Sequence, residues 1–251
     1  MTQRYICFGL DFGEAESGKH VFACHNFLDY SGEARKSNIN INIEETMAIL
    51  TRCSFDESHR QPIFLLGGIP ALAELIQVES SAHSASGPAQ CREVRRYAVV
   101  ALTNLTFGNA SIKSFLCSFP GFVEIMVGQL QCNWENLRKA TAHLFRNLAW
   151  KADKASKAVL SESGVVSVLM VAAMSVSARS LLDTPAGLAV EPGREEPTLK
   201  VILSALWNLS AHCRKNKSDV CGMEGSLVFL TQLLRSRSTA IVEVNIVLQN
   251  I

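Results

Sequence analysis

The sequence predicts an all-α solenoid built from consecutive repeats of three helices. Apolar residues recur at helical spacing through most of the chain, and the alternating pattern of β-strands is nearly absent. A short motif centred on Asn recurs along the chain, and so does a Gly that opens an apolar helix. Because the two markers share the same intervals, they belong to one repeating unit.

The Asn marker has Leu or Phe two residues before the Asn and Leu directly after it. Its full copies are ALTNLTF at 101–107, LFRNLAW at 144–150 and ALWNLSA at 205–211, and LQNI at 248–251 is a fourth. The asparagines of this ladder, at intervals of 43, 61 and 42 residues, are Asn104, Asn147, Asn208 and Asn250.

The Gly marker recurs at intervals of 53, 43 and 61 residues, at Gly68, Gly121, Gly164 and Gly225. The longest interval contains residues 178–197, where three prolines and two glycines predict an inserted loop. Residues 79–90 predict a second loop in the first interval. The two loops lengthen their units without changing the order of the helices.

The unit with the long insertion predicts three helices, at Asp153–Ser161, Gly164–Ser175 and Thr198–His212. The Gly before the second helix permits a sharp turn of the backbone that a residue with a Cβ resists. The apolar residues that flank the asparagines predict the core, and they are Leu102, Leu105, Leu144, Leu148, Leu206 and Leu209.

A period of about 40–47 residues with two or three helices is typical of armadillo and HEAT repeats. The three-helix unit, with Gly before its second helix and L-x-N-L in its third, resembles the armadillo form. Such units stack into a right-handed superhelix whose concave side is lined by the third helices. We expect a non-repeat segment at 1–40 and an armadillo array at 41–251, with about four repeats. The last repeat is expected to be incomplete, which is typical of a fragment or a truncated form.

Several longer motifs together are similar to the armadillo domain of the adenomatous polyposis coli family. They are CSFDESHR at 53–60, RRYA at 95–98, ALTNLTFG at 101–108, RNL at 146–148 and SALWNLSAHC at 204–213. The resemblance covers about residues 43–251. The β-catenin-binding repeats and the basic microtubule-binding region of that family are absent from this sequence.

The resemblance implies a non-enzymatic scaffold that binds extended peptide segments of other proteins in its concave groove. One such partner is a Rho-family guanine-nucleotide exchange factor, and cytoskeletal and Wnt-pathway adaptors are others. The resemblance further implies negative regulation of Wnt/β-catenin signalling and control of the cytoskeleton and of cell migration. It implies a cytoplasmic, cytoskeleton-associated location.

The side chains of the ladder have the chemistry that such a groove needs. A carboxamide has one acceptor oxygen and two donor N–H groups, so that it binds the backbone of an extended peptide without reading its side chains. Aromatic and Arg side chains are typical of interaction hot spots, and local cations favour a ligand that carries carboxylates. We therefore place the peptide-binding groove on Asn104, Phe107, Lys113, Arg146, Asn147, Trp150, Trp207 and Asn208.

The ladder asparagines and Trp207 also have a purely structural interpretation. A ladder Asn equally fits a role in satisfying backbone groups of the adjacent repeat. Trp207 fits a core position between repeats, whereas Phe107 and Trp150 are expected to be exposed at the ends of their helices. In the first unit the ladder position is occupied by Arg52, so that the ladder changes character there.

Composition and motifs argue against other classes of function. The chain of 251 residues has 24 Lys and Arg against 23 Asp and Glu, without the basic surplus of a nucleic-acid binder. Its longest apolar run, residues 164–176, is too short to span a membrane. We find no catalytic motif and expect no enzyme activity, no cofactor and no metal site, because the group Cys7, His20, Cys24 and His25 fits no zinc spacing.

Another kind of armadillo adaptor, resembling importin-α or β-catenin and carrying a different cargo peptide, is the alternative. Importin-α has a Trp four residues before each ladder Asn, where basic signal peptides stack. Here those positions are Val100, His143 and Ser204, so that the array for a basic peptide is missing.

Overall fold

The computed structural model describes residues 43–83, 87–182, 196–211 and 213–249, and the predicted non-repeat segment at 1–40 lies outside them. All regular structure in the described residues is helical, which confirms the all-α fold. The chain divides into two compact units, and the division falls between Phe107 and Gly108.

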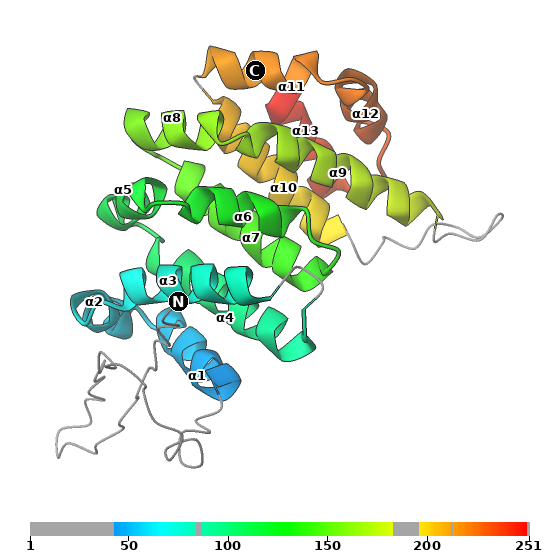
Figure 1. Cartoon of the computed structure of the whole chain (residues 1–251). Coiled ribbons are helices and arrows are strands. Elements are labelled where there is room, and N and C mark those ends of the chain that lie inside the picture. The colour runs from blue at the N-terminus through cyan, green and yellow to red at the C-terminus, as the bar shows by residue number, and fades with distance from the viewer. Residues whose placement is uncertain (1–42, 84–86, 183–195, 212, 250–251) are drawn as a thin grey trace. The chain divides into compact units, whose positions relative to one another are not determined.

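The first unit contains one helix followed by a helical triplet (Figure 1). Helices α1 and α3 both pack against α4. The apolar centre includes Met47, Ile69, Leu72 and Leu102, all of which are fully buried. The helices are α1 (Ile43–Phe55), α2 (Glu57–Leu65), α3 (Gly68–Ala82) and α4 (Ala89–Leu105).

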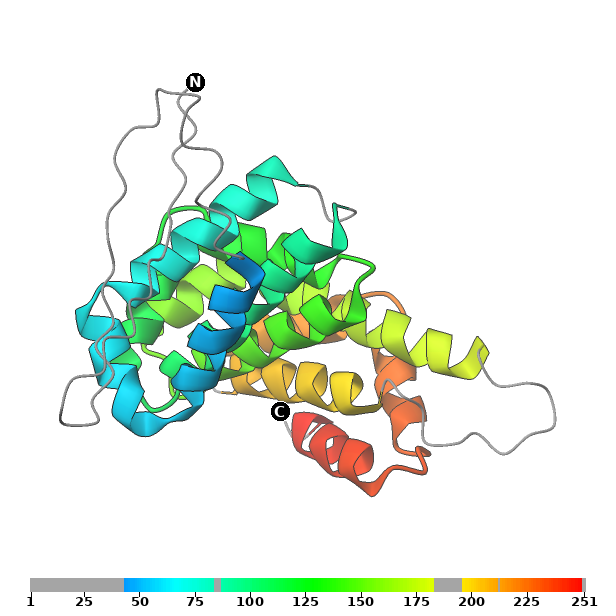
Figure 2. The ribbon, with the colours of Figure 1, turned by 90° about the horizontal axis from the view of Figure 1, so that it is seen from below.

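The second unit contains three successive triplets. Their third helices lie side by side, because α10 packs against both α7 and α13, and Figure 2 shows the yellow α10 next to the red α13. The helices of these triplets are α5 (Ala110–Ser118), α6 (Phe122–Leu130), α7 (Glu135–Ala149), α8 (Lys154–Glu162), α9 (Val165–Leu182), α10 (Glu196–Ser210), α11 (Arg214–Gly222), α12 (Ser226–Leu233) and α13 (Thr239–Gln249).

An Asp or Asn begins the first helix of three triplets. The side chain of Asp56 accepts a hydrogen bond from the N–H of Ser58, and Asn109 and Asp153 cap α5 and α8 in the same manner. Such caps satisfy a backbone donor that has no partner inside the helix. They separate the short first helix of each triplet from the third helix of the preceding one.

The Gly marker before the second helix is confirmed in three triplets and shifted by one residue in the first. Gly121, Gly164 and Gly225 have φ between 71° and 75°, a left-handed conformation that favours Gly. In the first triplet Gly67, with φ 78°, takes this role, and the predicted marker Gly68 is the first residue of α3. Gly68 is needed for a different reason, because a Cβ there would lie 2.6 Å from Cγ2 of Ile63.

Helix boundaries differ from the predictions mainly next to the loops. Helix α9 continues to Leu182, because residues 178–182 contain no helix breaker, and α10 begins at Glu196 with Pro197 in its first turn. The loop predicted at 79–90 is shorter, since α3 continues to Ala82 and α4 begins at Ala89. The loop predicted at 178–197 is therefore also shorter, and its centre lies outside the described residues.

The predicted core is confirmed. The six leucines that flank the ladder asparagines are at most 2% exposed. In the part of the chain that the structure describes, no single helix has the length and apolarity to cross a membrane, and three bent helix pairs pass that test by length and composition only.

Candidate peptide-binding surface

The eight predicted groove residues divide between the two compact units. Asn104 and Phe107 lie at the end of α4 in the first unit. The remaining six belong to the second unit, where Lys113 lies on α5 and the others lie on or directly after α7 and α10.

In the second unit, one ladder Asn is bonded to the neighbouring repeat. The Nδ2 of Asn208 donates to the carbonyl oxygen of Arg146 over 3.0 Å, and the same oxygen accepts the N–H of Trp150 over 3.1 Å. The bond ties α10 to the last turn of α7 and fixes the orientation of the amide. It uses one of the two N–H donors, so that the oxygen Oδ1 and the second N–H retain capacity for a ligand.

In the first unit, Asn104 makes an equivalent connection through a hydroxyl group. Its Nδ2 donates to Oγ of Ser54 over 2.9 Å, and that hydroxyl donates to the carbonyl oxygen of Thr51 over 2.6 Å. Thr51 stands four residues before Phe55, as Arg146 stands four residues before Trp150. The amides of both units therefore have the structural role that the sequence left open, and this role orients them.

Two ammonium groups lie near the ring of Trp150. The Nζ of Lys113 donates to the carbonyl oxygen of Trp150 over 2.7 Å and lies 5.2 Å from the centre of its ring. The Nζ of Lys151 lies 4.7 Å from the same ring. A cation at the carboxyl end of α7 also stabilises the helix dipole.

Lys113, which the sequence placed in the groove, is buried and does not face a ligand in solvent. Its side chain is buried, and this burial, assisted by the charge of Lys151, lowers its pKa. The ammonium group of Lys113 therefore binds the backbone of Trp150 inside the protein. The cation presented to solvent beside Trp150 is Lys151, which is exposed.

Arg60 is the residue of this arrangement that the sequence analysis missed. Its guanidinium lies 6.0 Å from the ring centre of Phe107 and donates to the carbonyl oxygens of Ser54 and Phe55 over 3.0 and 2.9 Å. Arg60 follows its helix cap by four residues, as Lys113 does, and this shared position is the signal that could have identified it. The cation–aromatic pair therefore recurs, and Ala211 occupies the corresponding aromatic position of the next triplet.

The three aromatic residues of the predicted groove are all exposed. Phe107 is 63% exposed, Trp150 43% and Trp207 41%. The exposure of Phe107 and Trp150 is confirmed, whereas the core position considered for Trp207 is wrong. The reason is that Leu206 and Leu209 fill the packed side of α10, and Trp207 points about 100° away from Leu206 around the helix.

Unpaired cations accompany these aromatic side chains. Among the described residues, neither Arg146 nor Lys151 has a carboxylate partner. His143 lies one turn before Asn147, and burial, together with the charges of Arg146 and Lys139, lowers its pKa to about 4. His143 is therefore neutral at pH 7, and Arg146 and Lys151 supply the positive charge.

We call this part of the second unit the α7–α10 surface. It combines two amides, of which Asn208 is fixed by its bond to Arg146, with exposed rings and cations, and it consists of Arg146, Asn147, Trp150, Lys151, Trp207 and Asn208. Its chemistry fits an extended segment that offers backbone groups to the amides, apolar atoms to the rings and carboxylates to the cations.

The sequence is similar to those of the adenomatous polyposis coli proteins. The rat adenomatous polyposis coli protein is 43% identical over 211 residues, which is 84% of this chain and 7% of that protein. The human adenomatous polyposis coli protein 2 is 39% identical over 204 residues, 80% of this chain and 8% of that protein. Over this region the chain is a homologue of the adenomatous polyposis coli proteins.

The homology extends to a nematode adenomatous polyposis coli-related protein. The protein of Caenorhabditis elegans is 31% identical over 194 residues, 76% of this chain and 15% of its own length. The chain thus spans less than a tenth of the rat and human adenomatous polyposis coli proteins. No model of a known protein family matches the sequence.

Solved structures confirm the armadillo fold of this adenomatous polyposis coli homologue. A designed armadillo repeat protein in complex with the peptide (KR)4 has a TM-score of 0.61 and 19% identity, covering 85% of this chain and 76% of that one. The armadillo-repeats-only protein of Plasmodium falciparum has a TM-score of 0.60 and 18% identity, covering 82% and 78%. At such identities these likenesses concern the fold alone.

Proposed function

We propose that the chain is a non-enzymatic scaffold that binds an extended, acidic segment of a partner protein on the α7–α10 surface. The observation that carries the proposal is the Asn208 amide, which is oriented by its bond to Arg146 and lies next to the exposed Trp207. A donor and an acceptor held in one orientation bind a peptide backbone at a smaller entropic cost than mobile ones.

The sign of the charge separates this proposal from the importin-like alternative. The designed armadillo repeat protein of similar fold was solved in complex with a basic peptide, (KR)4. In this chain Arg146 and Lys151 have no carboxylate partner among the described residues, and they repel a basic ligand. The proposed ligand therefore carries Asp or Glu beside its apolar side chains.

The biological setting of the proposal comes from the homology. We infer that the chain acts, as the adenomatous polyposis coli resemblance implies, in negative regulation of Wnt/β-catenin signalling and in control of the cytoskeleton and of cell migration. A Rho-family exchange factor and adaptors of those pathways are the partner class, and the cytoplasm with its cytoskeleton is the location. The support is identity of about 40% over four-fifths of the chain.

The test is the binding of fluorescent peptides to the intact chain. Acidic–aromatic peptides selected from a library should bind, and the double variant Arg146→Ala with Asn147→Ala should weaken binding at least tenfold, because a charge and a backbone contact are lost together. Lys154→Ala is the matched control, since it removes an exposed cation from α8 without touching the surface. Affinity should fall as salt rises.

Two results would contradict the proposal. One is preferential binding of basic peptides, which would favour the importin-like alternative. The other is equal loss of binding in the Lys154→Ala control, which would mean that the interaction reflects net charge alone. The helical content of the double variant should stay unchanged, so that the loss is assigned to the surface.

A further inference from the structure

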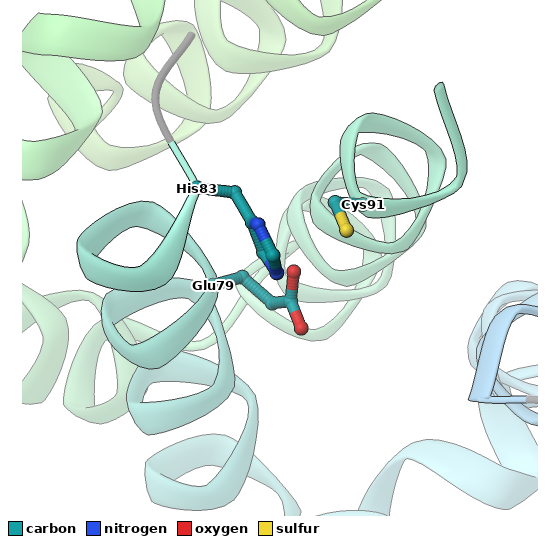
Figure 3. A group of neighbouring side chains, drawn as sticks. All are labelled: Glu79, His83 and Cys91. Carbon is teal, nitrogen blue, oxygen red and sulfur yellow. The ribbon is translucent and has the colours of Figure 1, made fainter. Parts of the chain in front are cut away.

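Three potential metal ligands meet where α3 ends and α4 begins. Figure 3 shows the side chains of Glu79, His83 and Cys91 pointing toward one another. One ligand atom of each residue lies within 4.8 Å of the other two. Glu79 and His83 stand four residues apart, so that both lie on one side of the end of α3, and Cys91 lies in the first turn of α4.

The distances suit an ion after a small contraction. With zinc bonds of about 2.0 Å to nitrogen or oxygen and about 2.3 Å to sulfur, the three tetrahedral ligand atoms are about 3.3–3.5 Å apart. The three side chains therefore need to close by roughly 1 Å. All three are half-buried, and α3 and α4 already pack against each other, so that rotation of side chains suffices.

The group also contains a buried carboxylate oxygen. The oxygen Oε2 of Glu79 is buried and has no hydrogen-bond partner in the part of the chain that the structure describes. Buried acceptors of this kind are uncommon, and a bound ion is one of the explanations for them.

We propose that Glu79, His83 and Cys91 bind a Zn²⁺ ion, with water as the fourth ligand. Binding removes the thiol proton of Cys91 to solvent, and the thiolate and carboxylate together neutralise the two charges of the ion. The imidazole of His83 binds in its neutral form. The ion clamps the end of α3 to the start of α4, across the junction that holds residues 84–86.

Soft thiolate and imidazole ligands favour zinc over magnesium or calcium. The spacing E-x3-H-x7-C is not one of the common zinc patterns, and only the meeting of two helices identifies it. The earlier candidate from the sequence, with Cys7, His20, Cys24 and His25, lies outside the described residues. The experiment must therefore separate the two groups.

The test is titration of the full chain, under reducing conditions, with Zn²⁺ and with Co²⁺ as a spectroscopic probe. We expect one equivalent of Zn²⁺ and a thiolate-to-cobalt charge-transfer band in the near ultraviolet. Cys91→Ser should remove that band, and Cys91→Ser and His83→Gln should each weaken zinc binding at least about a hundredfold, because even residues behind a ligand contribute 10–100-fold. Excess Zn²⁺ should raise the melting temperature of the native chain and of neither variant.

Matched variants give the result that would overturn the proposal. Cys221→Ser removes an exposed thiol of the second unit and should leave binding unchanged. The double variant Cys24→Ser with His25→Gln should also bind normally. A cobalt band that persists in Cys91→Ser, or that disappears in the Cys24 and His25 variant, refutes the site at α3 and α4. Circular dichroism of each variant confirms that the fold is kept.

Discussion

At the scale of single residues, side chains that connect neighbouring helices also orient the groups that are offered to a ligand. Asn208 bonds to Arg146 of the preceding third helix and still retains an acceptor and a donor for a ligand. The ammonium group of Lys113 donates to the carbonyl oxygen of Trp150 and lies near its ring, and these contacts hold the exposed ring in place. The side chains that hold the repeats together are thus the ones that orient the proposed surface.

His143 makes the stability of the second unit depend on pH. Its pKa is about 4 in the folded protein, mainly because of burial, against about 6.5 in an unfolded chain. Between pH 6.5 and pH 4, His143 therefore binds a proton in the unfolded state and stays unprotonated in the folded state. The free energy of unfolding consequently falls as the pH falls through this range.

The prediction for His143 is tested by the slope of stability against pH. In denaturant titrations at several pH values, His143→Gln should show a shallower fall in unfolding free energy between pH 6.5 and pH 4 than the native chain. Above pH 7 the slopes of the two proteins should agree. Identical slopes over the acidic range would mean that His143 is protonated equally in both states.

At the scale of elements, the third helices α4 and α7 are each followed by one residue with positive φ. After α4 this residue is Gly108, with φ 71°, and the equivalent residue after α7 is Lys151, with φ 52°. A side chain in this conformation costs about 1–2 kcal/mol, and Gly avoids that cost. At Lys151 the contact of the ammonium group with the Trp150 ring partly offsets this backbone strain.

Gly should be favoured over Ala at both of these positions. Lys151→Gly should have a free energy of unfolding about 0.5–1 kcal/mol above that of Lys151→Ala, because both variants lose the ammonium contact with Trp150 and only Ala keeps a strained Cβ. Gly108→Ala should lower it by about 1 kcal/mol through backbone strain alone, because a Cβ there meets no atom within 4 Å. Chemical denaturation measures both, and Lys151→Ala, which keeps a Cβ, should bring no gain.

At the scale of the second unit, each helix packs mainly against its neighbours in the solenoid. Helix α10 contacts α7, α9 and α13, whereas α5 contacts α6 and α8. In such an arrangement the free energy of unfolding is close to the sum of the stabilities of single repeats and of the interfaces between neighbours. A defect in one repeat therefore destabilises the adjacent repeats most.

A cavity in α10 should therefore show its effect locally. Leu206 is fully buried, and Leu206→Ala should lower stability by about 2–5 kcal/mol. Amide hydrogen exchange should accelerate in α7, α9, α10 and α13 by more than in α5. Uniform acceleration throughout the second unit would show one cooperative body, and Ser204→Ala, on the half-buried side of the same helix, is the control.

For the molecule as a whole, the sequence by itself determined the all-α class, the repeat, the third helices and the core leucines. These features are encoded locally, in spacings that recur along the chain, and homology to the adenomatous polyposis coli proteins follows from the same motifs. The sequence placed the glycine with positive φ before α3 at Gly68, whereas the structure has it at Gly67, one residue earlier.

Only the tertiary structure decided which polar side chains are buried and which are presented. Lys113 and Trp150 are 37 residues apart and Asn208 and Arg146 are 62 apart, so that no periodic pattern records their contacts. The meeting of Glu79 and His83 with Cys91 likewise depends on the angle between two helices. Burial and pairing are properties of packed surfaces, and the chain acquires them only when neighbouring helices come together.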